Sequence, residues 1–118
     1  LDPRISDQEF SSDDQLFMQQ ALELAQKAFS ENEVPVGAII VEEHKILGSS
    51  YNQPIGLNDP CAHAEILALR EAAKTKNNYR LVNTTLYVSL EPCAMCVGAM
   101  IHARVQRLVF AALDPKTG

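Results

Sequence analysis

Residues 85–96 are Thr85-Leu86-Tyr87-Val88-Ser89-Leu90-Glu91-Pro92-Cys93-Ala94-Met95-Cys96. The alternation of apolar and polar side chains at their start predicts a strand over residues 84–90. Proline is preferred in the first turn of a helix, so we expect a helix from Pro92 to about residue 102. Cys93 and Cys96 are three residues apart, and one helical turn would place both sulfur atoms on the same face.

A second stretch, further upstream, repeats this arrangement. The acid-Pro-Cys-Ala tetrapeptide of residues 91–94 also occurs at residues 59–62, where His63-Ala64-Glu65 follows it. Apolar residues at helical spacing predict a helix over 62–75. Both sets of polar side chains should therefore lie at helix N-termini, which can converge on one point. The partial positive charge of a helix N-terminus also favours the thiolate form of a cysteine.

The rest of the chain alternates strands with helices. The further predicted elements are a loose polar segment 1–11, a helix 13–30 with a capping box in Ser12-Asp13-Asp14-Gln15, strands 36–41 and 46–51, a loop 51–60 and a strand 105–113. Strands that alternate with helices after an opening hairpin predict an α/β fold, and specifically a three-layer sandwich.

The composition describes one domain of 118 residues, with 47% hydrophobic and 21% charged residues, as is ordinary for a soluble globular protein. No apolar run approaches the ~20 residues needed to span a bilayer, and no secretory signal pattern opens the chain. Three cysteines, two of them in C-x-x-C, argue against a disulfide framework and for reduced thiols, hence for the cytoplasm. The net charge of −5 provides no overall basic surface for nucleic acid.

One imidazole and two thiols form a ligand set that zinc prefers. A catalytic zinc takes three protein ligands and leaves a fourth position for water, and His63, Cys93 and Cys96 would supply three. Glu65 would lie beside this water, where a carboxylate can move protons. The residues therefore predict a hydrolytic zinc enzyme.

Two other uses of these residues stay open at this point. Cys61 could join His63, Cys93 and Cys96 in a closed structural Cys3His site, although C-x-H is a shorter span than zinc ligands usually show. We expect Cys61 to be a small buried hydrophobe instead. A redox role for the C-x-x-C would leave His63 unexplained. We expect Glu91 to cap a helix or to line the pocket.

The motif H-x-E followed by P-C-x-x-C is the signature of the zinc-dependent nucleobase deaminases. Over residues 15–118 the chain resembles, more specifically, the tRNA-specific adenosine deaminases. The segments that carry this resemblance are Val34-Pro35-Val36-Gly37-Ala38, Tyr51-Asn52-Gln53-Pro54-Ile55-Gly56, Asp59-Pro60-Cys61-Ala62-His63-Ala64-Glu65-Ile66, Asn78-Tyr79-Arg80-Leu81, residues 85–96 and Val109-Phe110-Ala111-Ala112-Leu113-Asp114-Pro115-Lys116-Thr117-Gly118.

The resemblance implies a cytidine-deaminase-like three-layer α/β/α sandwich with a central mixed sheet. It also implies a homodimer that converts adenosine to inosine at the wobble position of a tRNA anticodon stem-loop. One Zn2+ per chain would be held by His63, Cys93 and Cys96, and Glu65 would be the catalytic proton shuttle. A free-base or nucleotide deaminase, acting on guanine, cytosine or cytidine, is the alternative.

The resemblance also implies three substrate-binding residues. Asn52 would hydrogen-bond the flipped-out base, the Ala64 backbone N–H would help to hold its ring, and Asp114 would lie near the anticodon strand. Two features depart from the family. Cys61 stands where a small hydroxyl residue is more usual, and the family continues with a further strand and helix after the position of Gly118. We therefore expect residues 1–118 to be a single deaminase domain that lacks its C-terminal strand and helix.

Overall fold

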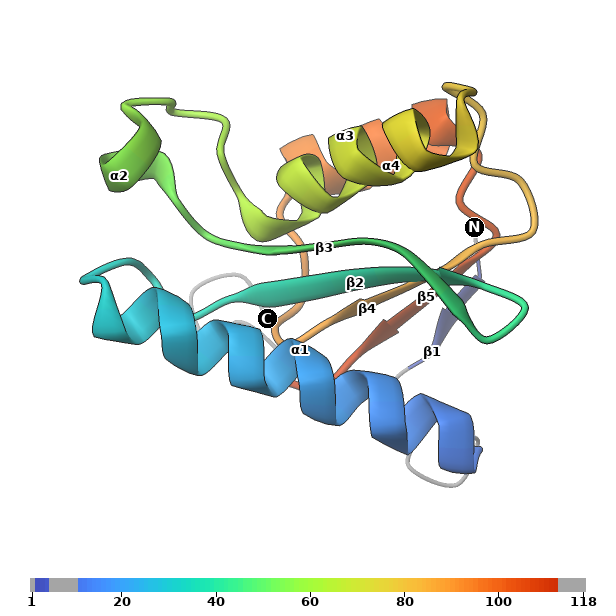
Figure 1. Ribbon diagram of the computed structural model, residues 1–118, viewed down its shortest axis with the longest axis horizontal. Coiled ribbons are helices and arrows are strands. Elements are labelled where there is room, and N and C mark those ends of the chain that lie inside the picture. The colour runs from blue at the N-terminus through green and yellow to red at the C-terminus, as the bar shows by residue number, and fades with distance from the viewer. Residues whose placement is uncertain (1, 5–10, 113–118) are drawn as a thin grey trace.

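The computed structural model describes residues 2–4 and 11–112, in which a sheet lies between two helical layers (Figure 1). The elements are β1 (Asp2–Arg4), α1 (Ser12–Ser30), β2 (Gly37–Glu42), β3 (Lys45–Tyr51), α2 (Pro54–Leu57), α3 (Ala64–Lys76), β4 (Thr85–Val88), α4 (Ala94–Ala103) and β5 (Arg107–Phe110). Among the described residues, no helix is long and apolar enough to cross a bilayer.

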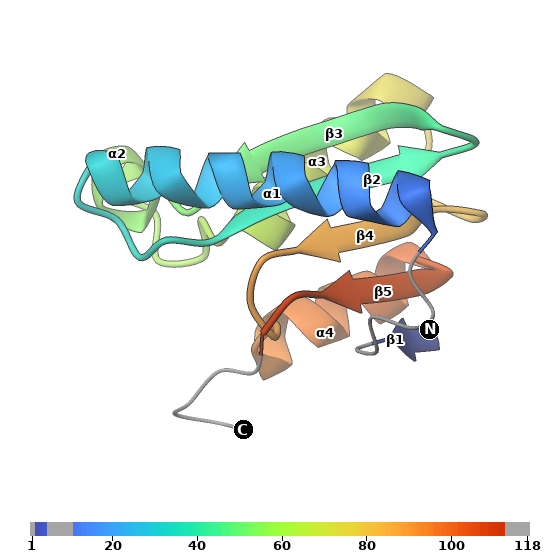
Figure 2. The same ribbon diagram turned by 90° about the horizontal axis from the view of Figure 1, so that it is seen from below.

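The sheet has five strands in the order β1-β5-β4-β2-β3 (Figure 2). β2 pairs antiparallel with both β3 and β4, whereas β5 pairs parallel with both β4 and β1. The sheet is therefore mixed, and the predicted α/β three-layer sandwich of the cytidine-deaminase-like type is confirmed.

Alternate residues of β2, an interior strand, face opposite layers, which is why helices cover both sides. In β2, Ala38 and Ile40 belong to the core cluster beneath α3 and α4, whereas Ile39 and Val41 belong to the cluster beneath α1. A strand buried on both faces consists almost wholly of apolar residues. On the α3 side the helix comes so near that a Cβ on Gly48 would lie 2.5 Å from the Ala68 carbonyl oxygen. This close packing against β3 fixes α3, whose first turn carries candidate site residues.

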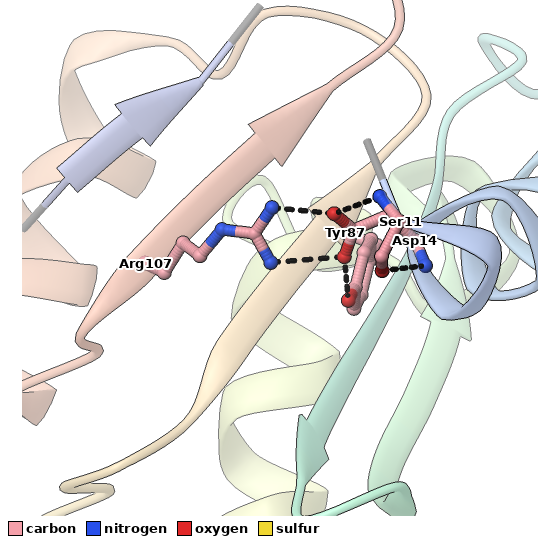
Figure 3. A network of polar contacts seen from close by, with 4 residues as sticks. All are labelled: Ser11, Asp14, Tyr87 and Arg107. Atoms are coloured by element: carbon pink, nitrogen blue, oxygen red, sulfur yellow. Dashed lines mark hydrogen bonds and ion pairs between the residues drawn. The ribbon is translucent and has the colours of Figure 1, made fainter. Parts of the chain in front are cut away.

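A buried polar network ties the start of α1 to the sheet (Figure 3). The Arg107 guanidinium donates to both Asp14 carboxylate oxygens, at 2.9 and 2.5 Å, and the Tyr87 hydroxyl donates to Asp14 as well. The Asp14 side chain is 3% exposed, so the bonds compensate for the cost of burying a charge.

Most predicted elements are confirmed, but some details are wrong. The α1 capping box consists of Ser11 and Asp14, one residue before the predicted pair. Residues 2–4 form β1 by pairing with β5, although the segment was expected to be loose. The loop after β3 contains the four-residue helix α2, whose first N–H groups are bonded by the distant Glu33. Contacts between distant segments produce β1 and α2, so local periodicity could not reveal these two elements.

Candidate metal and base-binding site

Two helix N-termini converge at the candidate metal site. His63 is the N-cap residue of α3 and Cys93 that of α4, both with extended backbone and neither making a side-chain cap. Their side chains are therefore free to point away from their own helices. His63 Nδ1 lies 3.6 Å from the Cys93 sulfur and 3.5 Å from the Cys96 sulfur. The structure thus brings the three predicted ligands together, with all their ligand atoms within 4.8 Å of one another.

This geometry fits a tetrahedral zinc. Bonds of about 2.3 Å to sulfur and about 2.0 Å to nitrogen at tetrahedral angles imply N···S separations of about 3.5 Å. The chemistry of the donors fits as well. Burial, followed by the nearby Glu65 carboxylate, raises the pKa of the Cys96 thiol, so the helix N-terminus alone does not make it a thiolate. A bound divalent cation would favour the thiolate and would offset this effect.

Glu65 lies in the first turn of α3 and is 4% exposed. Burial raises the pKa of its carboxyl group above the usual value, and the favourable interactions with His63 and Cys96 only partly counter this rise. A raised pKa makes the protonated form of a carboxyl group easier to reach, which suits a group that must accept a proton and return it. The structure therefore places Glu65 where a general acid–base would be useful.

Asn52 reaches the same place from the end of β3. Its side chain is buried, and its Oδ1 accepts a hydrogen bond from the Ala64 N–H at 2.7 Å. Ala64 is the first residue of α3, so this bond satisfies one of the N–H groups that the His63 side chain leaves uncapped. The Asn52 oxygen is thereby engaged, and its amide NH2 group remains as a donor.

These residues line one cavity of about 190 Å³. Its lining consists of Val34, Val36, Asn52, His63, Glu65, Leu90, Glu91 and Cys93. The volume is below the roughly 300–1,000 Å³ of pockets for drug-sized ligands, and it suits a group as small as a single base. Sequence reasoning did not identify the apolar walls, since Val34, Val36 and Leu90 have no chemical signature of a site.

Glu91 lines the cavity as predicted, but it does not cap α4, because Cys93 holds the N-cap position. One Glu91 carboxylate oxygen is buried and has no hydrogen-bond partner among the described residues. Cys61 is exposed, so its predicted burial is wrong, and it lies outside the ligand cluster. The reason is local: the Cys61 N–H donates to Asp59 Oδ1 in a surface turn. Asp114 lies outside the described residues.

A model of the cytidine and deoxycytidylate deaminase zinc-binding region matches residues 11–112. The chain belongs to this family. Its cofactor is therefore zinc, in agreement with the donor set of the candidate site.

Named relatives within the family include tRNA enzymes. The tRNA-specific adenosine deaminase of Haemophilus influenzae is 56% identical over 106 residues, which are 89% of this chain and 61% of that protein. The one of Buchnera aphidicola subsp. Schizaphis graminum is 55% identical over 86% of this chain and 68% of its own length. These relatives place the chain with the tRNA-specific adenosine deaminases, of which it spans roughly two thirds.

Solved structures agree with this placement. One comes from a study of A-to-I editing by tRNA deaminases at the wobble position; it matches with a TM-score of 0.84 and 43% identity, over 86% of this chain and 74% of that one. A guanine deaminase from Bacillus subtilis matches with a TM-score of 0.81 and 38% identity, over 84% of this chain and 64% of that one.

Proposed function

We propose that the protein converts adenosine to inosine at the wobble position of tRNA by zinc-dependent hydrolysis. One observation carries the proposal: two of the three clustered metal-ligand side chains, His63 and Cys93, border one base-sized cavity together with a buried carboxylate and a buried amide. The sequence identity with named tRNA-specific adenosine deaminases supports tRNA as the substrate.

The proposed roles follow from the geometry. The zinc would be held by His63, Cys93 and Cys96. When bound, it would act as a Lewis acid that lowers the pKa of an adjacent water. Glu65 takes a proton from the attacking water and delivers it to N1 of the adenine ring, as oxygen bonds to C6. Glu65 then takes the remaining proton from the new C6 hydroxyl and passes it to the amino group, and the C6–N bond breaks to release ammonia and leave the C6 carbonyl of inosine.

The base would be held from the side of β3. Since the Ala64 N–H occupies the Asn52 oxygen, the Asn52 NH2 group donates to a ring nitrogen of the purine. Ala64 is a predicted substrate-binding residue. Its backbone N–H would help to hold the base indirectly, because it orients the Asn52 amide. Asp114 is proposed to contact the anticodon strand on the basis of the resemblance.

We propose further that residues 1–118 act as one deaminase domain, and that the protein is a cytoplasmic homodimer. An apolar groove between α3 and α4, which a second copy could cover, supports the dimer. Its apolar lining residues are Ile66, Leu69, Ala73, Leu81, Ala99 and Ala103. Light scattering on the full-length protein tests the dimer, because introducing a charge with Ala99→Glu should yield monomers.

Inosine formation in a wobble-adenosine anticodon stem-loop is the test of the activity. The zinc-loaded full-length protein should convert that single adenosine and should leave free guanine, cytosine and cytidine unchanged. The likeness to a guanine deaminase makes a small-base deaminase the second candidate. Turnover of a free base, without turnover of the stem-loop, would establish that candidate instead.

A further inference from the structure

One wall of the cavity is built from two loops that are distant in sequence. Val34 and Val36 belong to the loop between α1 and β2, and Asn52 follows β3. The Asn52 N–H donates to the Val36 carbonyl oxygen at 3.0 Å, and the next N–H, of Gln53, donates to Ala62. The position of the Asn52 side chain therefore depends on how firmly these loops are joined.

Glu33 joins them. The residue is 6% exposed, and its two carboxylate oxygens accept from the Ile55 N–H at 3.2 Å and from the Gly56 N–H at 2.8 Å. These two N–H groups belong to the first turn of α2, whose N-cap residue Gln53 makes no side-chain cap. A carboxylate 22 and 23 residues upstream thus satisfies donors that a neighbouring side chain would ordinarily bond.

Glu33 is itself held in place. Its N–H donates to the Ala28 carbonyl oxygen at 2.9 Å, so the residue is anchored to the last turn of α1. α2 lies at the same end of the molecule as this turn (Figures 1 and 2). With four residues, α2 is too short to be stable alone, because the first turn of a helix costs more conformational entropy than its bonds return.

We propose that Glu33 is a positioning residue of the deaminase site, which holds α2 and through it the amide of Asn52. The proposal rests on the proposed function in one respect, namely that Asn52 contacts the base. A carboxylate buried this deeply is costly unless it is bonded, and its bonds lead into the loop that carries Asn52. Loss of the Glu33 carboxylate would free α2 and leave Asn52 without a fixed orientation toward the cavity.

Amide hydrogen exchange tests the proposal without any substrate. In Glu33→Ala, the Ile55 and Gly56 amides should exchange about tenfold faster or more, as expected for loss of a charge-assisted hydrogen bond. The Ala64 amide, bonded to Asn52 Oδ1, should also exchange faster, whereas the Leu67 amide, bonded within α3 to His63, should not change. Unchanged exchange at Ala64 would show that Glu33 only caps α2, and the inference would be overturned.

The matched control is Glu31→Gln. This carboxylate lies in the same loop but bonds the exposed Tyr51 hydroxyl, so its loss should leave the Ala64 amide unaffected. Glu33→Gln, which keeps one acceptor oxygen, should be intermediate, and it provides the readout if Glu33→Ala folds poorly. Zinc content should equal that of the wild type in all three variants, because neither Glu31 nor Glu33 belongs to the ligand cluster.

A double-mutant cycle with Asn52→Ala completes the test. Glu33→Ala alone should lower kcat/KM for the stem-loop about 10- to 100-fold, an effect of the size of one or two hydrogen bonds. In the Asn52→Ala background the same change should cost less than about twofold, because the two residues act as a unit. Fully additive costs would refute the coupling. A wild-type protein that is inactive on the stem-loop would refute the proposed function instead, while the exchange at Ala64 would still decide the role of Glu33.

Discussion

The N-terminus of α1 and the N-termini of α3 and α4 use their cap positions differently. At α1, the Ser11 hydroxyl accepts from the Asp14 N–H and the Asp14 carboxylate accepts from the Ser11 N–H, both at 3.1 Å. At α3 and α4, the cap positions hold His63 and Cys93, which make no cap. The first helix thus uses its cap residues for stability, whereas the other two place candidate metal ligands at these positions. Stability and chemistry should therefore respond separately to mutation.

Glu65→Gln should produce the largest effect and should affect only the chemistry. The amide cannot exchange protons, so kcat/KM for inosine formation should fall by about 10²–10⁴-fold. Stability should be unchanged or higher, because a buried carboxyl group with a raised pKa is replaced by a neutral group of the same shape. Kinetics, zinc analysis and thermal unfolding on one preparation provide the three measurements. Loss of zinc in this variant would contradict the role assigned to Glu65.

Arg107→Met should have the opposite effect at α1. It leaves the Asp14 carboxylate buried without its cation, which should cost about 2–4 kcal/mol in the free energy of unfolding by urea. Zinc binding and kcat/KM should stay at wild-type values below the unfolding temperature. Lys76→Met is the matched control, since it breaks the more exposed pair with Glu42 and should cost about 1 kcal/mol or less. Equal costs for the two variants would mean that the network of Figure 3 is no more than a surface ion pair.

Acid should weaken the α1 end through Asp14. Although burial opposes the charged form, the bonds from Arg107, Tyr87 and Ser11 hold the pKa of Asp14 at about 2 instead of 3.8. A depressed pKa contributes stability that is fully present above the unfolded value and is lost as pH falls through about 2. The stability difference between wild type and Asp14→Asn should therefore shrink by about 2 kcal/mol between pH 6 and pH 2. A difference that stays constant with pH would exclude this linkage.

The elements that the sequence predicts well are those with a strong local period. The helices at α1, α3 and α4 and the strand pair β2–β3 lie within about two residues of their predicted bounds. β1 and α2 were missed, because three or four residues carry no usable period and form only through contacts with β5 and Glu33.

At the site, sequence predicts the residues that act through their own chemistry. The spacing of His63, Cys93 and Cys96 suffices to infer a metal cluster, because each residue type is itself a preferred zinc ligand. Glu33 was missed because a carboxylate in a loop is usually solvated, and its bonds to α2 depend on how the chain folds. The apolar walls of the cavity were missed because Val34, Val36 and Leu90 have no chemical signature of a site.

The smallest effect is expected from Cys61→Ser. This variant tests whether the segment at the N-terminus of α3 provides one metal ligand, His63, or two. Cys61 and Cys93 occupy equivalent places in the repeated tetrapeptide, but Cys61 is exposed in a turn and Cys93 faces His63. Cys61→Ser should therefore change the zinc dissociation constant by less than about twofold, whereas Cys93→Ser should weaken binding by 100-fold or more, because it removes one of three protein ligands. Competition with a chromophoric chelator measures both constants. A large loss of affinity in Cys61→Ser would instead indicate a closed Cys3His site, which leaves no position for water, and the hydrolytic function would fail with it.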